Sequence, residues 1–487
     1  MSSTRHHPVI AAATQQLAQA LGHENVRTDP QSLHAASFDN TRIPFPPHAV
    51  VHPRTEADIA TTLQLANTHH VPVTIRGAGS GCAGAAAPIH GGWVLSLAHW
   101  TRIAVDATAS LAHVQPGAIT ADIDAAAAAH GLFYPPDPSS VKYCTIGGNI
   151  ATNAGGLRAA KYGVCRDYIY ALEGFLPTGR FVRWGGPLRK YASGYNMKDL
   201  WIGSEGTLGV ITHATLKLIP RPQARHTFLL AFPTDEHALE AAVTLLAQHR
   251  TPSVLEFLDT QTVACAQHRA NAPVFPEAGA SAPPAILLVE IDGAPGALSD
   301  DIAHLRAWAR RHTPAWRETA DPAEAETLWN TRRTCSQAMY QLGNAKLNED
   351  IVVPLHAYIP LIQHTREIHA RTHLPTPTFG HAADGNFHIH IMYDRNDSVQ
   401  RLRAQEGIRL MMEKVVALGG AITGEHGIGI AKSPFLRLQH TTAEIDAMLA
   451  IKHALDPNHI LAPGQIFDIT NVWDHTPVTT PLPWDKH

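Results

Sequence analysis

The sequence predicts an α+β protein with at least two domains, and three observations lead to this fold class. The chain has 487 residues, which exceeds the size at which a single hydrophobic core stops growing. Before residue 222, glycine-rich loops separate short β-branched runs at residues 71–76, 93–97 and 210–219. After residue 226, runs typical of strands and of helices alternate. We therefore interpret residues 221–225 as the connection between two domains.

The N-terminal residues 1–43 form a separate segment in this interpretation. Residues 1–22 are typical of a short amphipathic helix, and no basic region leads into an apolar one, so we expect no secretory signal. A second helix is predicted over residues 55–69. Thr55 suits its N-cap, and Glu56 and Asp58 place negative charge in its first turn.

The second half of the chain alternates between two periodicities. Strands are predicted at residues 227–231 and 286–291, and helices at residues 235–249 and 297–311. Residues 271–284 are rich in proline, alanine and glycine and predict an exposed loop. From Asn471 onward the chain has several prolines and no periodicity, which is typical of a tail.

Composition excludes several classes of protein. A net charge of -4 gives no reason to expect nucleic acid as a partner. The five cysteines contain no C-x-x-C pair, so neither a disulfide scaffold nor a cysteine-held iron–sulfur cluster is expected. No run is long and apolar enough to span a membrane. The chain has 32 histidines, so chance clusters are common and histidine alone does not indicate a metal site.

A glycine-rich loop, Gly77-Ala78-Gly79-Ser80-Gly81, follows the apolar run that ends at Ile75 and Arg76. Glycines let the backbone approach a ligand and leave N–H groups for phosphate oxygens, and Arg76 adds positive charge. The loop lacks the G-x-G-x-x-G pattern that binds dinucleotides in Rossmann folds. On its own, a glycine-rich turn after a strand is more often structural than ligand-binding.

Further motifs follow in order: Pro135 to Ser139 before Thr145 to Asn149, then Asn153 to Gly156 before Lys161 to Gly163, and last Gly203 to Ile211. Together with the first loop they resemble the FAD-binding domain of the vanillyl-alcohol oxidase or PCMH type. The resemblance implies that FAD binds residues 44–222. The implied cofactor residues are Arg76, Gly77, Ala78, Gly79, Ser80, Gly81, Pro138, Ser139, Thr145, Gly147, Gly148, Asn153, Gly155, Gly156, Gly209, Val210 and Ile211. Residues 77–84 contain no histidine, so we expect the FAD to be non-covalent.

Histidines and a carboxylate gather in two later segments. His381 precedes an Asp384-Gly385 turn, and His388 and His390 are two apart, so they face one side of a strand. Glu425 and His426 stand side by side in a glycine-rich turn. Two histidines and a carboxylate are a common ligand set for a divalent transition metal. The alternative is that they are hydrogen-bonded loop residues of a histidine-rich chain.

These segments resemble the G-H-x-G-D-G-N-x-H-x-N and G-E-H-G-I-G signatures of the FAD-linked oxidase C-terminal domain. The resemblance implies an α+β domain with an antiparallel sheet over residues 223–468, followed by a tail at 469–487. It also implies zinc, manganese or iron on His381, His388 and Glu425, with His426 as the acid–base residue. Ala383 and His390 depart from the signature, which has glycine and asparagine there. We interpret His390 as a substrate contact or a further ligand.

Two basic residues complete the expected site. Leu328 to Arg332 resembles the segment whose arginine binds the substrate carboxylate, and a planar guanidinium suits that task. Arg333 is adjacent, and a surface role for Arg332 is the alternative. Lys346 is a second candidate for a carboxylate contact, although a solvated lysine is the ordinary interpretation.

The resemblances imply FAD-dependent, metal-assisted oxidation of a D-2-hydroxy acid of the D-lactate, glycolate or D-2-hydroxyglutarate type. Electrons would pass to an external acceptor, namely a quinone, a cytochrome or an electron-transfer flavoprotein. The alternatives are an oxidase that uses oxygen, a non-catalytic electron-relay subunit and a metal-only hydrolase. We expect a cytoplasmic protein, with peripheral attachment to the inner membrane and a homodimeric state left open.

Overall fold

The computed structural model describes residues 3–248, 251–271, 274 and 283–485. The chain forms two compact units. The first contains Met1–Gly155, Val164–Arg221 and Glu425–His487, and the second contains Gly156–Gly163 and Pro222–Gly424. The chain thus enters the second unit within the predicted connection at 221–225. The domain predicted over 223–468 includes residues 425–468, which this division assigns to the first unit.

A four-stranded sheet in the first unit has the order β1-β2-β4-β3. Strands β2, β4 and β3 are parallel, and β1 pairs with β2 in the antiparallel sense. The strands are β1 (Val26–Arg27), β2 (Ala49–Val51), β3 (Val73–Arg76) and β4 (Trp93–Ser96). Helices α1 (Ser3–Leu21) and α3 (Glu56–His69) contribute Leu17, Ile59 and Leu63 to the same buried core. The strands predicted around residues 71–76 and 93–97 are confirmed.

Helix α3 begins where its capping signal predicts. The Thr55 hydroxyl accepts a hydrogen bond from the Asp58 N–H at 3.2 Å, and the Asp58 carboxylate accepts one from the Thr55 N–H at 2.9 Å. This reciprocal pair is a capping box, which satisfies two N–H groups that the helix itself cannot. The helix ends at His69, because His70 adopts a left-handed φ of 51°.

A five-stranded antiparallel sheet with the order β5-β6-β10-β8-β9 is the second layer of this unit. Its strands are β5 (Ile103–Asp106), β6 (Leu111–Val114), β8 (Ile169–Phe175), β9 (Phe181–Gly185) and β10 (Val210–Lys217). The run at 210–219, predicted as one strand, divides into β10 and the short β11 (Ile219–Pro220), which pairs with β7 (Leu132–Phe133). The change of partner explains the division, because no single strand can follow both sheets.

Short elements connect these sheets and complete the first unit. They are η1 (His23–Asn25), α2 (Pro30–Ala36), α4 (Thr120–Ala128), β7 (Leu132–Phe133), α5 (Ile146–Thr152), η2 (Cys165–Tyr168), α7 (Met197–Trp201), β11 (Ile219–Pro220), η6 (Ser433–Phe435), α14 (Leu436–Gln439), α15 (Thr442–Leu455) and η7 (Val472–Asp474). The returning C-terminal segment extends the first sheet, because Leu461 bridges to Val73 in the parallel sense.

The second unit is built on a seven-stranded sheet with the order β15-β12-β14-β13-β17-β18-β16. Every neighbouring pair is antiparallel, as the predicted fold class requires. The strands are β12 (Ala224–Phe232), β13 (Val254–Leu258), β14 (Ala285–Gly293), β15 (Ala315–Thr319), β16 (Ala345–Val352), β17 (Thr378–His381) and β18 (Asn386–Tyr393).

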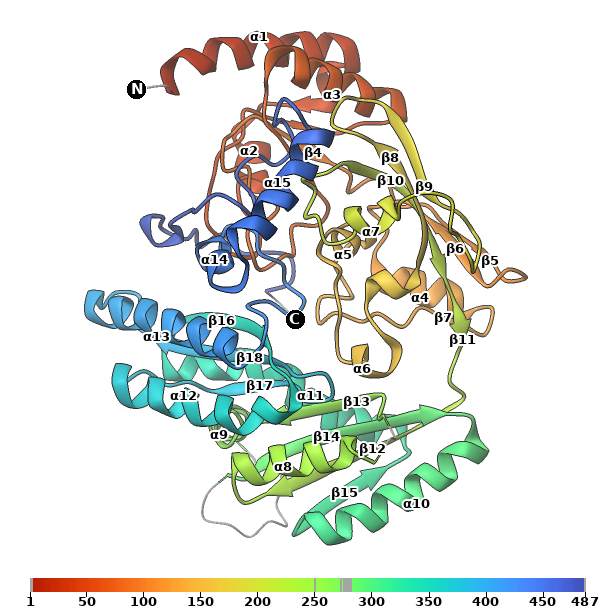
Figure 1. The fold of residues 1–487 in the computed structure, drawn as a ribbon, viewed down its shortest axis with the longest axis vertical. Coiled ribbons are helices and arrows are strands. Elements are labelled where there is room, and N and C mark those ends of the chain that lie inside the picture. The colour runs from red at the N-terminus through yellow and green to blue at the C-terminus, as the bar shows by residue number, and fades with distance from the viewer. Residues whose placement is uncertain (1–2, 249–250, 272–273, 275–282, 486–487) are drawn as a thin grey trace. The chain divides into compact units, whose positions relative to one another are not determined.

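Helices cover both faces of this sheet. They are α6 (Ala159–Tyr162), α8 (Asp235–Leu246), α9 (Thr260–Ala270), α10 (Pro295–His312), α11 (Pro322–Ala338), α12 (Tyr358–Thr372) and α13 (Ser398–Ala417), with single turns η4 (Met339–Leu342) and η5 (Leu355–Ala357). Figure 1 shows α8, α12 and α13 in front of the sheet. On the other face, α9 and α11 bury Val263 and Trp329 in a core with Leu288 and Met392 of the sheet.

Two predicted boundaries in this unit need correction. Strand β12 starts at Ala224, inside the segment interpreted as a connection, because its full length pairs with β14. Helix α8 stops at Leu246, earlier than the predicted end, while His249 lies outside the described residues. The predicted loop at 271–284 also lies largely outside them.

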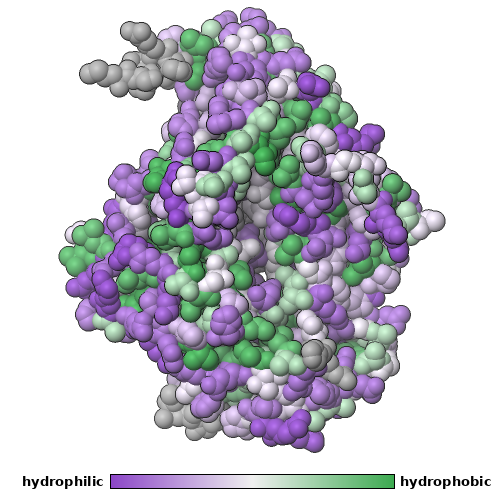
Figure 2. Space-filling view, viewed as in Figure 1, coloured by the Kyte–Doolittle hydropathy of each residue, from purple (hydrophilic) through white to green (hydrophobic). Residues whose placement is uncertain are grey.

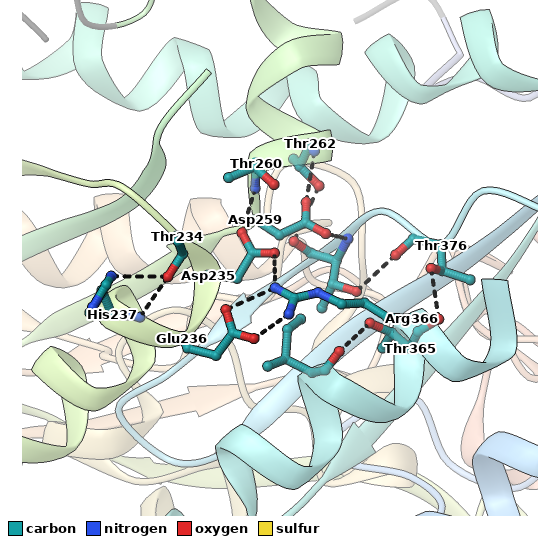
Figure 3. Close-up of polar contacts among 12 residues, drawn as sticks. Thr234, Asp235, Glu236, His237, Asp259, Thr260, Thr262, Thr365, Arg366 and Thr376 are labelled. Carbon is teal, nitrogen blue, oxygen red and sulfur yellow. Dashed lines mark hydrogen bonds and ion pairs between the residues drawn. The ribbon is translucent and has the colours of Figure 1, made fainter. Parts of the chain in front are cut away.

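A buried polar network fixes the starts of α8 and α9 in the second unit (Figure 3). The Asp259 carboxylate accepts hydrogen bonds from the N–H groups of Thr262 and Thr378, at 2.7 and 2.8 Å. The Asp235 carboxylate accepts from the Thr260 N–H at 2.8 Å and from Arg366 of α12 at 3.1 Å. The Glu236 carboxylate also accepts from Arg366, so Asp235 and Glu236 share one arginine beside Asp259.

No helix in the described part of the chain is long and apolar enough to cross a membrane. On the face seen in Figure 2, hydrophilic residues are spread between small groups of hydrophobic ones.

Candidate active site

A cavity in the first unit brings together loops that are far apart in the sequence. The glycine loop at 77–81 follows the C-terminal end of β3, and the first turn of α5 carries Gly147 and Gly148. The predicted cofactor residues that line the cavity are residues 76–81, Pro138, Ser139, Thr145, Gly147, Gly148, Gly209 and Ile211. The glycine loop presents backbone N–H groups, which suit an anionic ligand.

Four predicted cofactor residues have other surroundings. Val210 is fully buried in the core of the first unit. Asn153 ends α5 with a left-handed φ of 53°, and its side-chain oxygen accepts a hydrogen bond from the Arg166 N–H at 2.9 Å. Gly155 is not among the residues that line the cavity, and Gly156 belongs to the second unit.

Sequence reasoning missed several residues that line the cavity. They include Asn40, Cys82, Tyr143, Asn149, Trp201 and Glu205. Glu205 lies inside the Gly203-to-Ile211 motif, so its position beside glycines was a usable signal. Asn40 and Tyr143 belong to no motif, and only the folded chain brings them to the cavity.

The glycines of the cavity are required by close packing. A Cβ on Gly147 would lie 2.6 Å from the Pro116 side chain, and a Cβ on Gly209 would collide with the Trp201 ring. A Cβ on Gly81, in contrast, would meet no atom within 4 Å. The backbone is therefore fixed where it forms the wall, and it is open at Gly81. A ligand with phosphates and flat rings fits such a wall.

Arg76 supplies positive charge at this wall. Burial lowers the pKa of its guanidinium, and the nearby Asp39 carboxylate counteracts that effect. A partly buried cation of this kind favours an anionic ligand.

Glu425 and His426 line the same cavity as the glycine loop. The nearest approach of the His426 Nε2 atom to the Glu425 carboxylate is 4.0 Å. Glu205, which is 6% exposed, accepts hydrogen bonds from the N–H groups of Ile428 and Gly429, both at 2.8 Å. Burial raises the pKa of Glu205 to about 7, against the lowering effect of these two amides and of Lys432.

A second cluster lies in the second unit around Glu256, which is fully buried on β13. One carboxylate oxygen is hydrogen-bonded to His381 Nδ1, and the other accepts from Arg332 Nε at 2.5 Å. Burial acts to raise the pKa of Glu256, but His381 and Arg332 outweigh it and leave the pKa below its ordinary value. The Arg332 guanidinium also lies 4.1 Å from the centre of the Phe379 ring, a cation–π contact.

The histidines of β17 and β18 lie close to one another. The rings of His381 and His388 are 5.3 Å apart and perpendicular. His388 and His390 both contact the Phe379 ring, so they share a face of β18, as their spacing predicts. The Nδ1 atom of His381 is hydrogen-bonded to the Glu256 carboxylate, and Nε2 is the other nitrogen of this ring. A carboxylate on the other nitrogen is the usual arrangement for a metal-binding histidine.

The two remaining predicted substrate residues are also in this unit. His390 is fully buried and its Nδ1 lies 3.3 Å from the Pro377 carbonyl oxygen. Burial lowers the pKa of His390 well below its ordinary value, and Lys346 lowers it further. The Lys346 ammonium donates to the Ser336 carbonyl oxygen at 3.2 Å. The structure thus brings Arg332, His381, His388 and His390 around Phe379, and it ties Lys346 to the end of α11.

Two family models match successive parts of the chain. Residues 221–466 match the family model of the C-terminal domain of FAD linked oxidases, and residues 47–185 match that of an FAD binding domain. The glycolate oxidase subunit GlcD of Bacillus subtilis is 37% identical over 456 residues, which cover 93% of this chain and 96% of the relative. A D-lactate dehydrogenase of Anaerostipes hadrus is 34% identical over 429 residues, which cover 86% of this chain and 89% of the relative.

Solved structures show the same fold at low sequence identity. A structure of p-cresol methylhydroxylase with substrate bound superposes with a TM-score of 0.79, at 17% identity, and covers 95% of this chain and 97% of its own. With the sequence relatives, this likeness confirms the predicted fold class. The chain belongs to the FAD-linked oxidoreductases of the glycolate oxidase and D-lactate dehydrogenase type, and it combines a PCMH-type FAD-binding fold with an FAD-linked oxidase C-terminal domain.

Proposed function

We propose that the protein oxidises a D-2-hydroxy acid to the 2-oxo acid, with bound FAD as the first electron acceptor and a divalent metal at the substrate site. One observation carries the proposal: His426 lines the same cavity as the glycine loop at 77–81 and the first turn of α5. A proton acceptor and a place for a flavin therefore share one cavity. A subunit that only relays electrons has no need of such a proton acceptor.

The substrate carboxylate is assigned to Arg332. Its Nε is held by Glu256, and among the described residues its two Nη atoms have no hydrogen-bond partner. A guanidinium anchored in this way presents a fork that matches a carboxylate with two parallel hydrogen bonds. We assign His390 and Lys346 to the remainder of the substrate.

The metal is assigned to His381, His388 and Glu425. The Glu256 carboxylate on His381 Nδ1 supports this assignment, because a metal-binding histidine usually has such a partner on its second ring nitrogen. A divalent cation on this set would supply Lewis-acid stabilisation of the substrate oxygens. Zinc, manganese and iron all suit two imidazoles and a carboxylate.

The chain's own residues then have distinct tasks. Arg332 orients the substrate through its carboxylate, and the His426 imidazole takes the proton of the 2-hydroxyl oxygen. When bound, FAD supplies the redox chemistry by accepting the hydride of C2. The products are the 2-oxo acid, reduced flavin and a protonated His426. The electrons then pass to a quinone, a cytochrome or an electron-transfer flavoprotein.

Anaerobic mixing of the holoenzyme with a panel of D-2-hydroxy acids tests the proposal. We expect at least one of D-lactate, glycolate and D-2-hydroxyglutarate to bleach the flavin absorbance, and metal removal by a chelator to slow that bleaching. No bleaching by any acid in the panel would refute the oxidation. Unchanged bleaching by a metal-free enzyme would refute the role of the metal.

The variant His426→Ala tests the proton acceptor. It should keep its FAD and reduce it about 100-fold to 10,000-fold more slowly, because general-base catalysis contributes about that much. Stopped-flow absorbance measures the rate constant, and the flavin spectrum before mixing confirms that the cofactor is present. Fast reduction in this variant would remove His426 from the mechanism.

A further inference from the structure

Glu205 connects two parts of the first unit that the proposed reaction must hold together. Its backbone is hydrogen-bonded to α5, which together with the glycine loop at 77–81 lines the cavity and is called the flavin wall below. The Glu205 N–H donates to the Ala151 carbonyl oxygen at 2.8 Å, and the Gly203 N–H donates to the Ile150 carbonyl oxygen at 2.9 Å. Its side chain reaches the turn that follows His426, through the N–H groups of Ile428 and Gly429. One residue thus ties α5 to the His426 turn.

The backbone around Glu205 has an unusual conformation. Glu205 has a φ of +52°, in the left-handed region that a residue with a side chain rarely adopts. Gly203 and Gly206 on either side also have positive φ, and the Thr207 hydroxyl donates to the Ser204 carbonyl oxygen. The backbone conformation of the turn therefore sets the direction in which the Glu205 side chain leaves the chain.

The turn at residues 427–429 has a conformation that lets it approach the Glu205 carboxylate. Gly427 has a φ of +83°, and a Cβ there would lie 2.9 Å from the Glu205 carboxyl carbon. The turn can approach the carboxylate only because position 427 is glycine. Both N–H groups that Glu205 accepts come from consecutive residues, so the carboxylate fixes the orientation of the turn as well as its position.

We propose that Glu205 is a positioning residue that sets the distance and orientation of His426 relative to the flavin wall. This inference rests on the proposed role of His426 as proton acceptor. Glu205 touches neither the substrate nor the reacting atoms in this role. It acts through the backbone of residues 427–429, and a displacement of a catalytic group by about 1 Å can slow a reaction about 100-fold.

Two substitutions remove the hydrogen bonds between Glu205 and the turn to different extents. Glu205→Gln keeps one acceptor oxygen for the two amides, whereas Glu205→Ala keeps none. The matched control is Glu173→Gln in the same unit, whose carboxylate accepts from the exposed Arg183 at 2.7 Å and does not line the cavity. All three proteins are prepared with FAD, and the flavin spectrum and the thermal midpoint are recorded first.

Two readouts follow. The rate constant of anaerobic flavin reduction should fall about 10-fold in Glu205→Gln and about 100-fold in Glu205→Ala, with little change in KM. Hydrogen exchange of the peptide that contains Ile428 and Gly429 should speed up in the same order. Glu173→Gln should match the wild type in both.

The exchange readout does not depend on activity. If no hydroxy acid reduces the wild-type flavin, the proposed function fails, and exchange at residues 428–429 still decides whether Glu205 anchors the turn. Unchanged exchange in Glu205→Ala would overturn the proposal. Faster exchange with an unchanged reduction rate would overturn it too, as would loss of FAD as the only effect, because then Glu205 would act on the cofactor rather than on His426.

Discussion

Glu256 is the only charged residue of strand β13, and its carboxylate joins two side chains that the sequence marks for different tasks. His381 is the expected metal ligand and Arg332 the expected carboxylate contact, and both are bonded to this one buried group. A buried carboxylate with two cationic or donor partners is stable, but it is costly to leave half satisfied. The metal and substrate assignments therefore share a dependence on Glu256.

We predict that Glu256→Gln weakens metal binding about 10-fold to 100-fold, which is the usual effect of losing such a partner of a metal-binding histidine. The amide can accept from only one of the two donors, so His381 or Arg332 loses its anchor. KM for the hydroxy acid should rise as well. Metal content after dialysis against a graded chelator, together with KM, measures both effects.

The matched control is Glu318→Gln. Glu318 accepts hydrogen bonds from His226 Nε2 at 2.8 Å and from Arg306 Nε at 2.6 Å, so it bridges the same two residue types away from the expected site. It should lose neither metal nor substrate affinity. Equal metal retention in Glu256→Gln and in the wild type would contradict the prediction.

At the residue scale, predictability depended on whether a side chain belonged to a local pattern. Motifs in order along the chain gave the residues at 76–81 and the two glycines of α5. Glu256 also left a signal, since a carboxylate in the middle of the run Val-Leu-Glu-Phe-Leu needs a buried partner. Asn40 and Tyr143 left none, because their place at the cavity depends on contacts between distant segments.

At the scale of elements, the signals that worked were those in which the cause is local. The capping box of α3 lies within four residues, so Thr55 and Asp58 could be recognised in the sequence. The ends of β10 and the start of β12 were misjudged because sheet partners decide them. A strand continues for as long as a neighbour is available to pair with it, and the neighbour of β12 lies more than fifty residues later.

The starts of α8 and α9 give an element-scale prediction for pH. Burial, followed by the charge of Asp235, raises the pKa of Asp259 to about 8, whereas an unfolded aspartate has its ordinary value of 3.8. The folded protein therefore binds this proton more tightly. Between about pH 4 and pH 8 the unfolded state loses the proton first, so the free energy of unfolding falls as the pH rises through this range.

Asp259→Asn should flatten this pH dependence, because the amide does not titrate. Its stability at low pH should also fall by about 1–3 kcal/mol, since one of the two backbone donors, Thr262 or Thr378, loses its acceptor. Denaturant unfolding at pH 5 and pH 8 measures both quantities (Figure 3). The test concerns the difference between the two pH values, so a lower overall stability does not obscure it. If the free energy of unfolding changed equally with pH in the two proteins, Asp259 would not be the group that titrates.

At the scale of the whole molecule, the return of the chain to the first unit had no local sign. Residues 425–487 follow directly on a segment of the second unit, and the glycine-rich turn around Glu425 resembles other loops of the chain, so it does not by itself mark a passage between units. The returning segment nevertheless contributes Ile460 and Leu461 to the core of the first unit and bridges to β3. Long-range pairing of this kind is set by tertiary contacts, which periodicity along the chain does not report.

The C-terminal tail has a second consequence for the first unit. The Trp484 ring stacks on Tyr143 at 4.9 Å with an interplanar angle of 11°, and its Nε1 donates to the Asn40 side chain at 3.0 Å. Tyr143 and Asn40 both line the cavity. The Asp485 carboxylate holds the end of the tail on Arg42, at 2.6 and 2.7 Å. The tail thus contacts two residues, Asn40 and Tyr143, that line the expected FAD site.

We predict that Trp484→Ala raises the dissociation constant of FAD roughly 2-fold to 10-fold, which corresponds to the loss of one aromatic contact. A protein that ends at Asp474 should show an effect at least as large, because it also loses the contact of Asp485 with Arg42. Trp473→Ala is the matched control, since it removes a tryptophan of the same tail and keeps the stacking of Trp484 on Tyr143. Recovery of flavin fluorescence after dilution measures the release of FAD. If Trp484→Ala and Trp473→Ala release FAD at the same rate, the tail has no part in holding the cofactor.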